Sequence, residues 1–300
     1  MTLRIAHFSD IHLTARRLGW RPRDLVSKRV TGWFNVKMLG RGKHFRHAPA
    51  VIEALVEELR LRTFDALAFS GDATGMGFSS EFAIAADALA VADPTWPPAV
   101  AVPGNHDYYT KRAVLHSQFE NHFAHWQVGE RIDEHRYPFA RRVGDAWLVA
   151  VNSATVNRGY ADASGEIGSD QLERLKKLCD RLEAGRRILV THYPLRTAAG
   201  LVERRAHRLR DHVAALQTAI DCRISFWLHG HIHQPFVLAK TKEIPFPIAC
   251  VGSSTMNHHW AYHDYSITPT HVEGIRRVFE QEIGKFRVES TFSLEMPDTV

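Results

Sequence analysis

Five short polar stretches, each following a predicted buried strand, constrain this 300-residue chain more than any other feature. The stretches are Ser9-Asp10-Ile11-His12, Gly71-Asp72, Gly104-Asn105-His106-Asp107, Thr191-His192 and Gly230-His231-Ile232-His233. They offer two carboxylates, one amide and four imidazoles as ligands, together with a fifth histidine and no thiolate. Oxygen and nitrogen ligands of this kind suit divalent metals. The pattern therefore predicts a site for a pair of divalent metal ions.

The placement of these stretches follows from an alternation of short apolar runs and amphipathic segments, which is typical of a sheet covered by helices. Strands are predicted at residues 3–8, 66–69, 98–102, 146–151, 187–190 and 224–228. Helices are predicted at residues 48–62, 80–90, 169–184 and 208–220. In open α/β sheets, ligands bind beyond the carboxyl ends of the strands, because loops from several strands converge there. We therefore expect an α/β protein whose five polar stretches meet at one edge.

The C-terminal part of the chain has a different character. Apolar runs at residues 236–240, 248–251, 262–268, 271–275 and 286–292 follow one another without helical segments between them. We interpret these runs as antiparallel strands, since short connections join antiparallel neighbours. The end of the chain is thus predicted to be β-rich.

Composition favours one domain in a reducing compartment. The chain is 45% hydrophobic and no low-complexity linker divides it, so we predict a single domain over residues 1–300. Cys179, Cys222 and Cys250 lack the spacing of a disulfide framework or a zinc ribbon. The sequence shows neither a signal peptide nor an apolar run of about 18 residues. We expect a soluble, cytoplasmic protein, and the basic segment described next leaves peripheral attachment to a membrane open.

Positive charge is concentrated in an insert between Thr14 and Arg46. This segment has ten Lys or Arg and one acidic residue, Asp24, for a net charge of +9, so the rest of the chain carries −4 of the total of +5. One helical face of the insert combines Val26, Val30, Trp33, Phe34 and Met38. We expect Asp24 to cap this helix, Gly40 to end it, and the insert to overhang the metal site, because it follows His12 directly.

Two interpretations of the insert remain open. Its apolar face could pack on its own domain or on a second subunit, which would make the protein a homo-oligomer. Alternatively, residues 16–46 could form a lid or a membrane-interface helix, because basic amphipathic helices that contain Trp bind anionic surfaces.

In this order, the five stretches resemble the pattern of the calcineurin-like metallophosphoesterases, which consists of Asp-x-His, Gly-Asp, Gly-Asn-His-Asp or Glu, a lone His, and Gly-His-x-His. The match extends from about Ile5 to His233. The resemblance implies a four-layer α-β-β-α sandwich with mixed sheets, and the β-rich tail is consistent with its second sheet.

The resemblance also implies roles for the site residues. One metal would be held by Asp10, His12 and His233, the other by Asn105, His192 and His231, with Asp72 bridging the two. Two cations would activate a shared, bridging hydroxide as the nucleophile. Beside the ligand Asn105, His106 would protonate the leaving oxygen, and Asp107 would either orient the His106 ring or serve as a turn residue. The ligand types suit Mn, Fe, Co, Ni or Zn.

The predicted reaction is hydrolysis of a phosphodiester. The stretches 71–75 and 102–107 are similar to those of small bacterial phosphodiesterases, including class III cyclic-nucleotide phosphodiesterases. Those proteins usually have His-His-Pro in the fourth stretch, whereas this chain has His192-Tyr193-Pro194. Because of the similarity in stretches 71–75 and 102–107, nucleotide-type substrates are the first prediction, with cyclic nucleotides as the lead.

Three alternatives accompany this prediction. The first is a pyrophosphohydrolase of a nucleotide-diphosphate lipid of the UDP-diacylglucosamine type, with the insert as its lid. The second is a nuclease, which is disfavoured because the basic residues of the insert are interspersed with an apolar stripe rather than with a stacking platform. The third is a noncatalytic scaffold, which is disfavoured because no expected ligand is missing.

Overall fold

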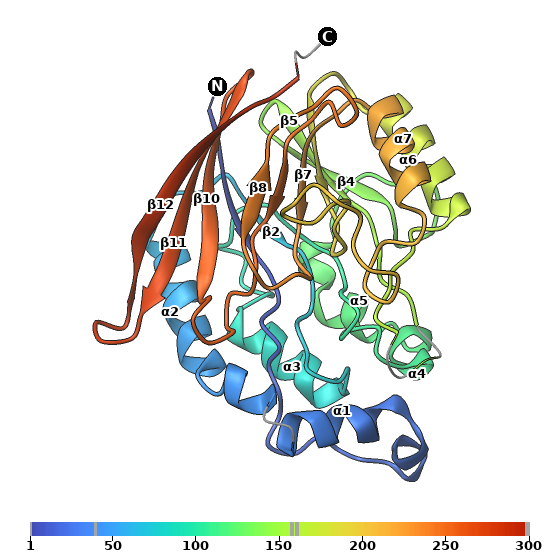
Figure 1. The fold of residues 1–300 in the computed structure, drawn as a ribbon, viewed down its shortest axis with the longest axis vertical. Helices are drawn as coiled ribbons and strands as arrows, with labels where there is room; N and C mark the ends of the chain where they lie inside the picture. The colour runs from blue at the N-terminus through green and yellow to red at the C-terminus, as the bar shows by residue number, and fades with distance from the viewer. Residues whose placement is uncertain (1, 39–40, 157–158, 160–161, 298–300) are drawn as a thin grey trace.

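The computed structural model describes residues 2–38, 41–156, 159 and 162–297, and its strands form two six-stranded sheets (Figure 1). The first sheet has, in spatial order, β12 (Lys285–Glu295), β11 (His271–Glu280), β10 (Ala261–Ile267), β1 (Leu3–Phe8), β2 (Ala66–Phe69) and β3 (Ala99–Ala101). Strands β1, β2 and β3 are parallel, while β10, β11 and β12 extend the sheet in antiparallel fashion from β1. The sheet is therefore mixed, as expected.

The second sheet is also mixed. Its order is β4 (Phe139–Val143), β5 (Ala146–Ala150), β6 (Arg186–Val190), β7 (Ile224–His229), β9 (Ile248–Cys250) and β8 (Phe236–Leu238). The neighbours β5, β6, β7 and β9 are parallel, whereas β4 and β8 are antiparallel edge strands. The prediction that 248–251 is an antiparallel strand is wrong for its pairing with β7, because β9 runs parallel to β7. The chain reverses its direction in β8, which lies between them in the sequence, so β9 is antiparallel to β8 alone.

Helices cover the outer face of each sheet. One apolar cluster joins α2 (Ala48–Leu61) and α3 (Ser79–Ala88) to the first sheet, and a second joins α6 (Ser169–Arg181) and α7 (His212–Asp221) to the other sheet. A third cluster lies between the two sheets. This arrangement is the predicted α-β-β-α sandwich.

The side chains of β2 show how the layers are specified. Leu67 and Phe69 belong to the cluster under the helices, whereas Ala66 and Ala68 belong to the cluster between the sheets. Alternate residues of a strand point to opposite faces, so a fully buried strand supplies two apolar layers at once.

The β-rich tail is divided between both sheets instead of forming the second one, because β10 pairs with β1.

The insert forms the end of the molecule opposite the start of β1 and the end of β12, where Figure 1 shows α1 (Lys28–Lys37). The expected cap is wrong: Ser27 caps α1 through a hydrogen bond from the Arg29 backbone, while Asp24 lies in the preceding 3-10 helix, Pro22–Val26. Gly40, the expected end of the helix, lies outside the described residues.

The sequence patterns missed some short elements. These are the helices α4 (Lys111–Leu115) and α5 (Gln118–His122) and the 3-10 helices Arg41–Phe45 and Ala124–Trp126. Among the described residues, none of the helices combines the length and the apolar character needed to cross a membrane. The interpretation of residues 1–300 as a single domain stays a prediction.

Candidate metal centre

The first group of candidate ligands lies at the carboxyl ends of β1, β2 and β7. Asp10, His12, Asp72 and His233 each offer one ligand atom, and these atoms all lie within 4.8 Å of one another. The Nε2 atoms of His12 and His233 are 3.0 Å apart, and Asp10 Oδ1 is 3.1 Å from His233 Nε2. The first and the last of the five polar stretches thus contribute side chains to one cluster.

The second group follows β3, β6 and β7. Asn105 Oδ1 lies 3.2 Å from His192 Nε2 and 3.0 Å from His231 Nδ1, and the two imidazole nitrogens are 3.3 Å apart. This set of one amide oxygen and two imidazoles is the one that the sequence assigns to a second metal.

Asp72 connects the two groups. Its Oδ2 atom lies 3.7 Å from His12 Nε2 in the first group and 3.5 Å from His192 Nε2 in the second. The structure therefore brings all seven predicted ligands together and places the Asp72 carboxylate between the two sets.

The backbone conformation at these residues is unusual. Asp10, His12, Asp72, His231 and His233 have φ between 41° and 70°, and they make up five of the nine non-glycine residues with positive φ in the described chain. Such conformations cost about 1–3 kcal/mol each and cluster at functional sites. The loops are therefore bent so that their side chains converge.

Two glycines permit the close approach of these loops. A Cβ at Gly104 would overlap the carboxylate of Asp72, and one at Gly230 would overlap that of Asp10. Each glycine thus leaves room for a carboxylate that comes from another strand.

The histidine tautomers fit metal binding. A backbone carbonyl can only accept a hydrogen bond, so the ring nitrogen facing it carries the proton. The carbonyls of Thr74, Ser70 and His207 face His12 Nδ1, His192 Nδ1 and His231 Nε2, at 3.3, 2.8 and 3.1 Å. The other nitrogen of each ring, which faces the cluster, therefore has the lone pair that a metal needs.

The electrostatics of the centre fit as well. Burial alone would raise the pKa of Asp10, but its contacts with His12 and His233 hold this pKa well below its ordinary value. Burial lowers the pKa of His192 and His231, which keeps both rings neutral. Asp10 Oδ1 is buried and has no hydrogen-bond partner outside the cluster, in which His233 Nε2 lies 3.1 Å away. A charged carboxylate beside neutral imidazoles suits a divalent cation.

Comparisons with known proteins decide the family. The profile of the calcineurin-like phosphoesterases matches residues 3–235, which include every candidate ligand. The chain belongs to this family. It is a metal-dependent phosphoesterase with a buried Asp/His site for metal. No curated protein matches the chain.

Solved structures show that this phosphoesterase shares its fold with distant phosphatases. A dimetal phosphatase from Danio rerio is 11% identical, with a TM-score of 0.62 and 98% of each chain covered. A purple acid phosphatase from yellow lupin (Lupinus luteus) is also 11% identical, with a TM-score of 0.63 over 99% of this chain. The phosphoesterase spans only 54% of the lupin chain. At these identities the likeness concerns the fold alone.

Two hydrogen bonds hold His106 beside the metal centre of the phosphoesterase, one from its backbone and one from its ring. Its backbone N–H donates to Asp72 Oδ1 at 2.7 Å, and its Nδ1 donates to the carbonyl of Gly75 at 2.7 Å. The ring lies edge-to-face with His12, with centroids 4.8 Å apart, and it stacks on Tyr109. These contacts direct Nε2 of His106 away from Gly75.

Asp107 braces the loops of the centre. Its carboxylate accepts hydrogen bonds from the backbone of Gly104, Ala73 and Thr74, at 2.9, 3.2 and 3.0 Å. Burial raises the pKa of Asp107 to about 7, although these hydrogen bonds oppose the rise. The contact that orients the His106 ring comes from Gly75, so Asp107 has the position of the turn residue that the sequence allowed as an alternative.

Some residues around the centre escaped the sequence patterns. The ring of Phe45, from the insert, lies 4.7 Å from that of His12, and the Ser253 hydroxyl donates to the backbone carbonyl of Asp10 at 2.7 Å. The carbonyls that fix the tautomers have no sequence signature, because every residue has one. For Phe45, the signal available was the position of the insert directly after the first polar stretch.

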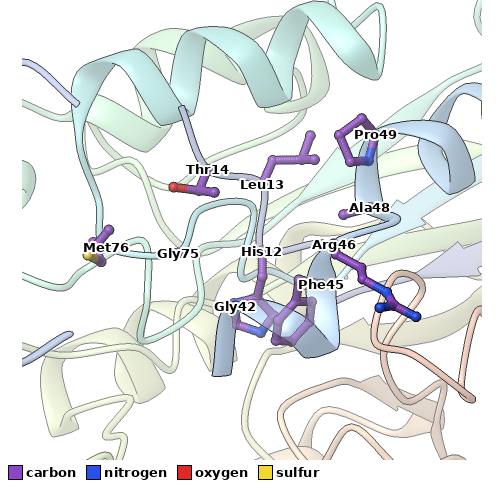
Figure 2. Close-up of a pocket in the computed structure, with 10 residues that line it drawn as sticks. All are labelled: His12, Leu13, Thr14, Gly42, Phe45, Arg46, Ala48, Pro49, Gly75 and Met76. Carbon is purple, nitrogen blue, oxygen red and sulfur yellow. The ribbon is translucent and has the colours of Figure 1, made fainter. Parts of the chain in front are cut away.

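A cavity adjoins the metal centre beside Phe45. Figure 2 shows its lining, in which the rings of His12 and Phe45 lie side by side and Arg46 stands at one edge. The cavity has a volume of about 190 Å³, and Leu13 and Met76 contribute apolar walls. Its lining includes the candidate ligand His12 and also Gly75, whose carbonyl accepts the hydrogen bond from His106.

Proposed function

We propose that this metallophosphoesterase is a phosphodiesterase that uses two divalent metals. Asp10, His12 and His233 would hold one metal, Asn105, His192 and His231 the other, and Asp72 would contact both. The position of Asp72 Oδ2 between His12 and His192 supports this division. Bound metals would supply water activation and neutralise charge on the phosphoryl oxygens. The donor set fits Mn, Fe, Co, Ni or Zn.

His106 would protonate the leaving oxygen. Because Nδ1 donates to the Gly75 carbonyl, Nε2 is the ring atom left to carry the proton for the leaving oxygen. The hydrogen bond from the His106 backbone to Asp72 keeps this ring beside the metal ligands. A second hydrogen-bonded group, the Asp107 carboxylate, holds the loop on which both Asn105 and His106 lie.

The cavity beside His12 is the observation that favours a diester over a monoester. A monoester has one organic group, whereas a diester has a second group that needs space close to the phosphorus atom. At about 190 Å³ the cavity is smaller than the roughly 300–1,000 Å³ of pockets for drug-sized ligands, so it suits one ring system. Nucleotide-type diesters, including cyclic nucleotides, are the first substrates to test, since Phe45 offers a ring for stacking.

A comparison of two chromogenic esters tests this function. The protein reconstituted with each metal should hydrolyse bis-p-nitrophenyl phosphate with a higher kcat/KM than p-nitrophenyl phosphate. The reverse preference would exclude the diesterase assignment, and full turnover by Asp72→Ala or His231→Ala would exclude the metal-dependent enzyme altogether. A panel of 2′,3′- and 3′,5′-cyclic nucleotides then identifies the substrate.

A second candidate is hydrolysis of a nucleotide-diphosphate lipid. It is supported by one observation, namely that the insert places the Phe45 ring against that of His12 and leaves apolar side chains exposed at residues 20–38. Such a substrate, added to the same panel with and without the insert residues 16–46, separates the two candidates: only the lipid substrate should depend on the insert.

A further inference from the structure

The insert exposes an unusual amount of apolar surface. Of the sixteen large apolar side chains that are exposed in the described chain, seven lie between residues 20 and 38. They are Trp20, Leu25, Val26, Val30, Trp33, Phe34 and Met38, and we call this set the apolar face. Val26 is 85% exposed and Met38 is 66% exposed. The apolar stripe of the predicted helix is therefore only partly covered by its own domain.

Polar groups hold α1 on the body of the protein instead. Arg29, which is buried, donates to Asp24 Oδ1 at 2.7 Å and to the carbonyl of Met76 at 3.2 Å. Its guanidinium lies 3.9 Å from the ring centroid of Phe78. Gly32, one turn later, lies so close to Tyr109 that a Cβ would overlap the hydroxyl group. The helix is thus anchored by its Arg29 side, and this anchoring turns the apolar face outward.

The exposed charges of the insert itself are of one sign. Among the described side chains of residues 14–46, the exposed charged ones are Arg16, Arg17, Arg21, Arg23, Lys43 and Arg46. The acidic residue of this segment, Asp24, is buried and paired with Arg29. A surface that combines Trp and Phe with basic residues complements an anionic lipid headgroup layer, where each Lys or Arg contributes about 1 kcal/mol.

Two neighbouring cavities lie between this surface and His12. One, of about 460 Å³, lies among Arg16, Arg17, Trp20 and Trp33. The other is the cavity beside His12 that Figure 2 shows. Thr14 and Met76 line both of them. The apolar face and the cavity beside His12 are therefore adjacent parts of one surface.

We propose that the apolar face docks the protein on an anionic membrane surface, with Trp20, Trp33 and Phe34 in the headgroup layer and the basic residues around them on lipid phosphates. This docking brings the cavity beside His12 to the lipid surface. Binding to lipid requires no turnover, so it can be measured whether or not the protein hydrolyses the diesters proposed above.

Sedimentation with lipid vesicles tests the docking. The full-length protein should bind vesicles that contain phosphatidylglycerol, bind pure phosphatidylcholine vesicles much more weakly, and be released by salt. The double variant Trp33→Ser/Phe34→Ser should lower the binding about tenfold or more, because two large apolar groups no longer leave water. The variant Arg21→Glu/Arg23→Glu should lower binding to the anionic vesicles only.

A matched variant controls for loss of apolar surface in general. Val213 and Ile283 are 71% and 57% exposed and lie on α7 and between β11 and β12, so Val213→Ser/Ile283→Ser should bind vesicles like the wild type. Equal binding by wild type and Trp33→Ser/Phe34→Ser would overturn the proposal. So would a dimer that this variant converts to a monomer in light scattering, since the apolar face would then cover a second copy.

Discussion

Asp72 contacts both groups of candidate ligands, so its substitution tests the two-metal hypothesis at one residue. Asp72→Asn keeps the shape but removes the charge from the oxygen that lies 3.7 Å from His12 and 3.5 Å from His192. We expect the loss of bound metal and a fall in kcat/KM of more than about 100-fold, the upper end for residues that only support a ligand.

Metal content, measured by mass spectrometry, is the readout for this variant. Asp170→Asn is the control, because Asp170 is an exposed carboxylate on α6 far along the chain from the five stretches. If Asp72→Asn retained two metals per chain and normal turnover, Asp72 would not join the two sites.

The loss of activity on substitution of His106 should depend on how strongly the leaving oxygen needs a proton. His106→Asn removes the proton donor, which contributes about 10²–10⁴-fold when the leaving oxygen needs protonation. The loss should be large for an alkyl leaving group, such as that of a cyclic nucleotide, and small for p-nitrophenolate, which departs without a proton. An equal loss for both leaving groups would assign His106 a role in substrate binding or in the structure of the site.

The sequence could predict the residues of the centre but not the conformations that assemble them. The ligand types and their order identified all seven residues that the structure brings together. The left-handed φ angles of Asp10, His12 and Asp72 could not be predicted from residue type, because Asp and His adopt such angles more often than most residues but still only rarely. The carbonyl of Gly75 that orients His106 was equally invisible, because it is a backbone group.

At the scale of the element, the buried Arg29 side chain helps to anchor α1, because it pairs with Asp24 within the insert and donates to the carbonyl of Met76 on the body. Arg29→Ala would leave Asp24 buried without its guanidinium partner, and breaking such a pair costs about 3–5 kcal/mol. Because the pair holds only the insert, we expect local opening of residues 20–38 rather than unfolding of the protein. Hydrogen exchange should show faster exchange in this segment and unchanged exchange in α6.

Arg23→Ala is the matched control for this experiment, since Arg23 lies in the same segment but is exposed. It should leave hydrogen exchange unchanged. If Arg29→Ala also changed nothing, contacts such as that of Gly32 with Tyr109 would be sufficient to hold α1.

The sequence pattern of the insert predicted its helix but not which face of the helix is buried. A 3.6-residue period correctly placed Val30, Trp33 and Phe34 on one face of a helix, but it does not say which face is buried. That depends on Arg29 and Gly32, whose partners Asp24 and Tyr109 lie in other elements. The direction of β9 was missed for a similar reason, because it depends on the intervening strand β8.

At the scale of the whole molecule, the pairing of β1 with β10 joins the two halves of the first sheet. Local sequence patterns could not predict this pairing, because the two strands lie far apart in the chain. Strand β1 pairs with β10 in a register that joins Leu3 to Ile267 and His7 to His263. The pairing places two titratable histidines between apolar layers, where both are buried. His263 Nδ1 lies 2.9 Å from the hydroxyl of Tyr265, which in turn packs between the sheets.

This burial predicts a specific response of stability to pH. Burial, assisted by Arg276, lowers the pKa of His263 to about 3 from an ordinary value of 6.5. Between these values the unfolded chain binds a proton that the folded protein does not, so the free energy of unfolding should fall as pH drops below about 6.5. The slope is about 1.4 kcal/mol per pH unit for one such histidine. Above pH 6.5 the group contributes nothing to the pH dependence.

His263→Gln retains a polar group that can face Tyr265 but does not titrate. The loss of stability between pH 7 and pH 5 should therefore be smaller by about 2 kcal/mol, because the slope acts only below about pH 6.5. Urea unfolding at the two pH values measures it, and comparison with the wild type cancels the contribution of the metal ligands, which both proteins share. Exposed His135 supplies the control, since His135→Gln should keep the wild-type slope. An unchanged slope in His263→Gln would mean that the folded protein protonates His263 in place, and the layer between the sheets would then have to admit a charge or water beside Tyr265.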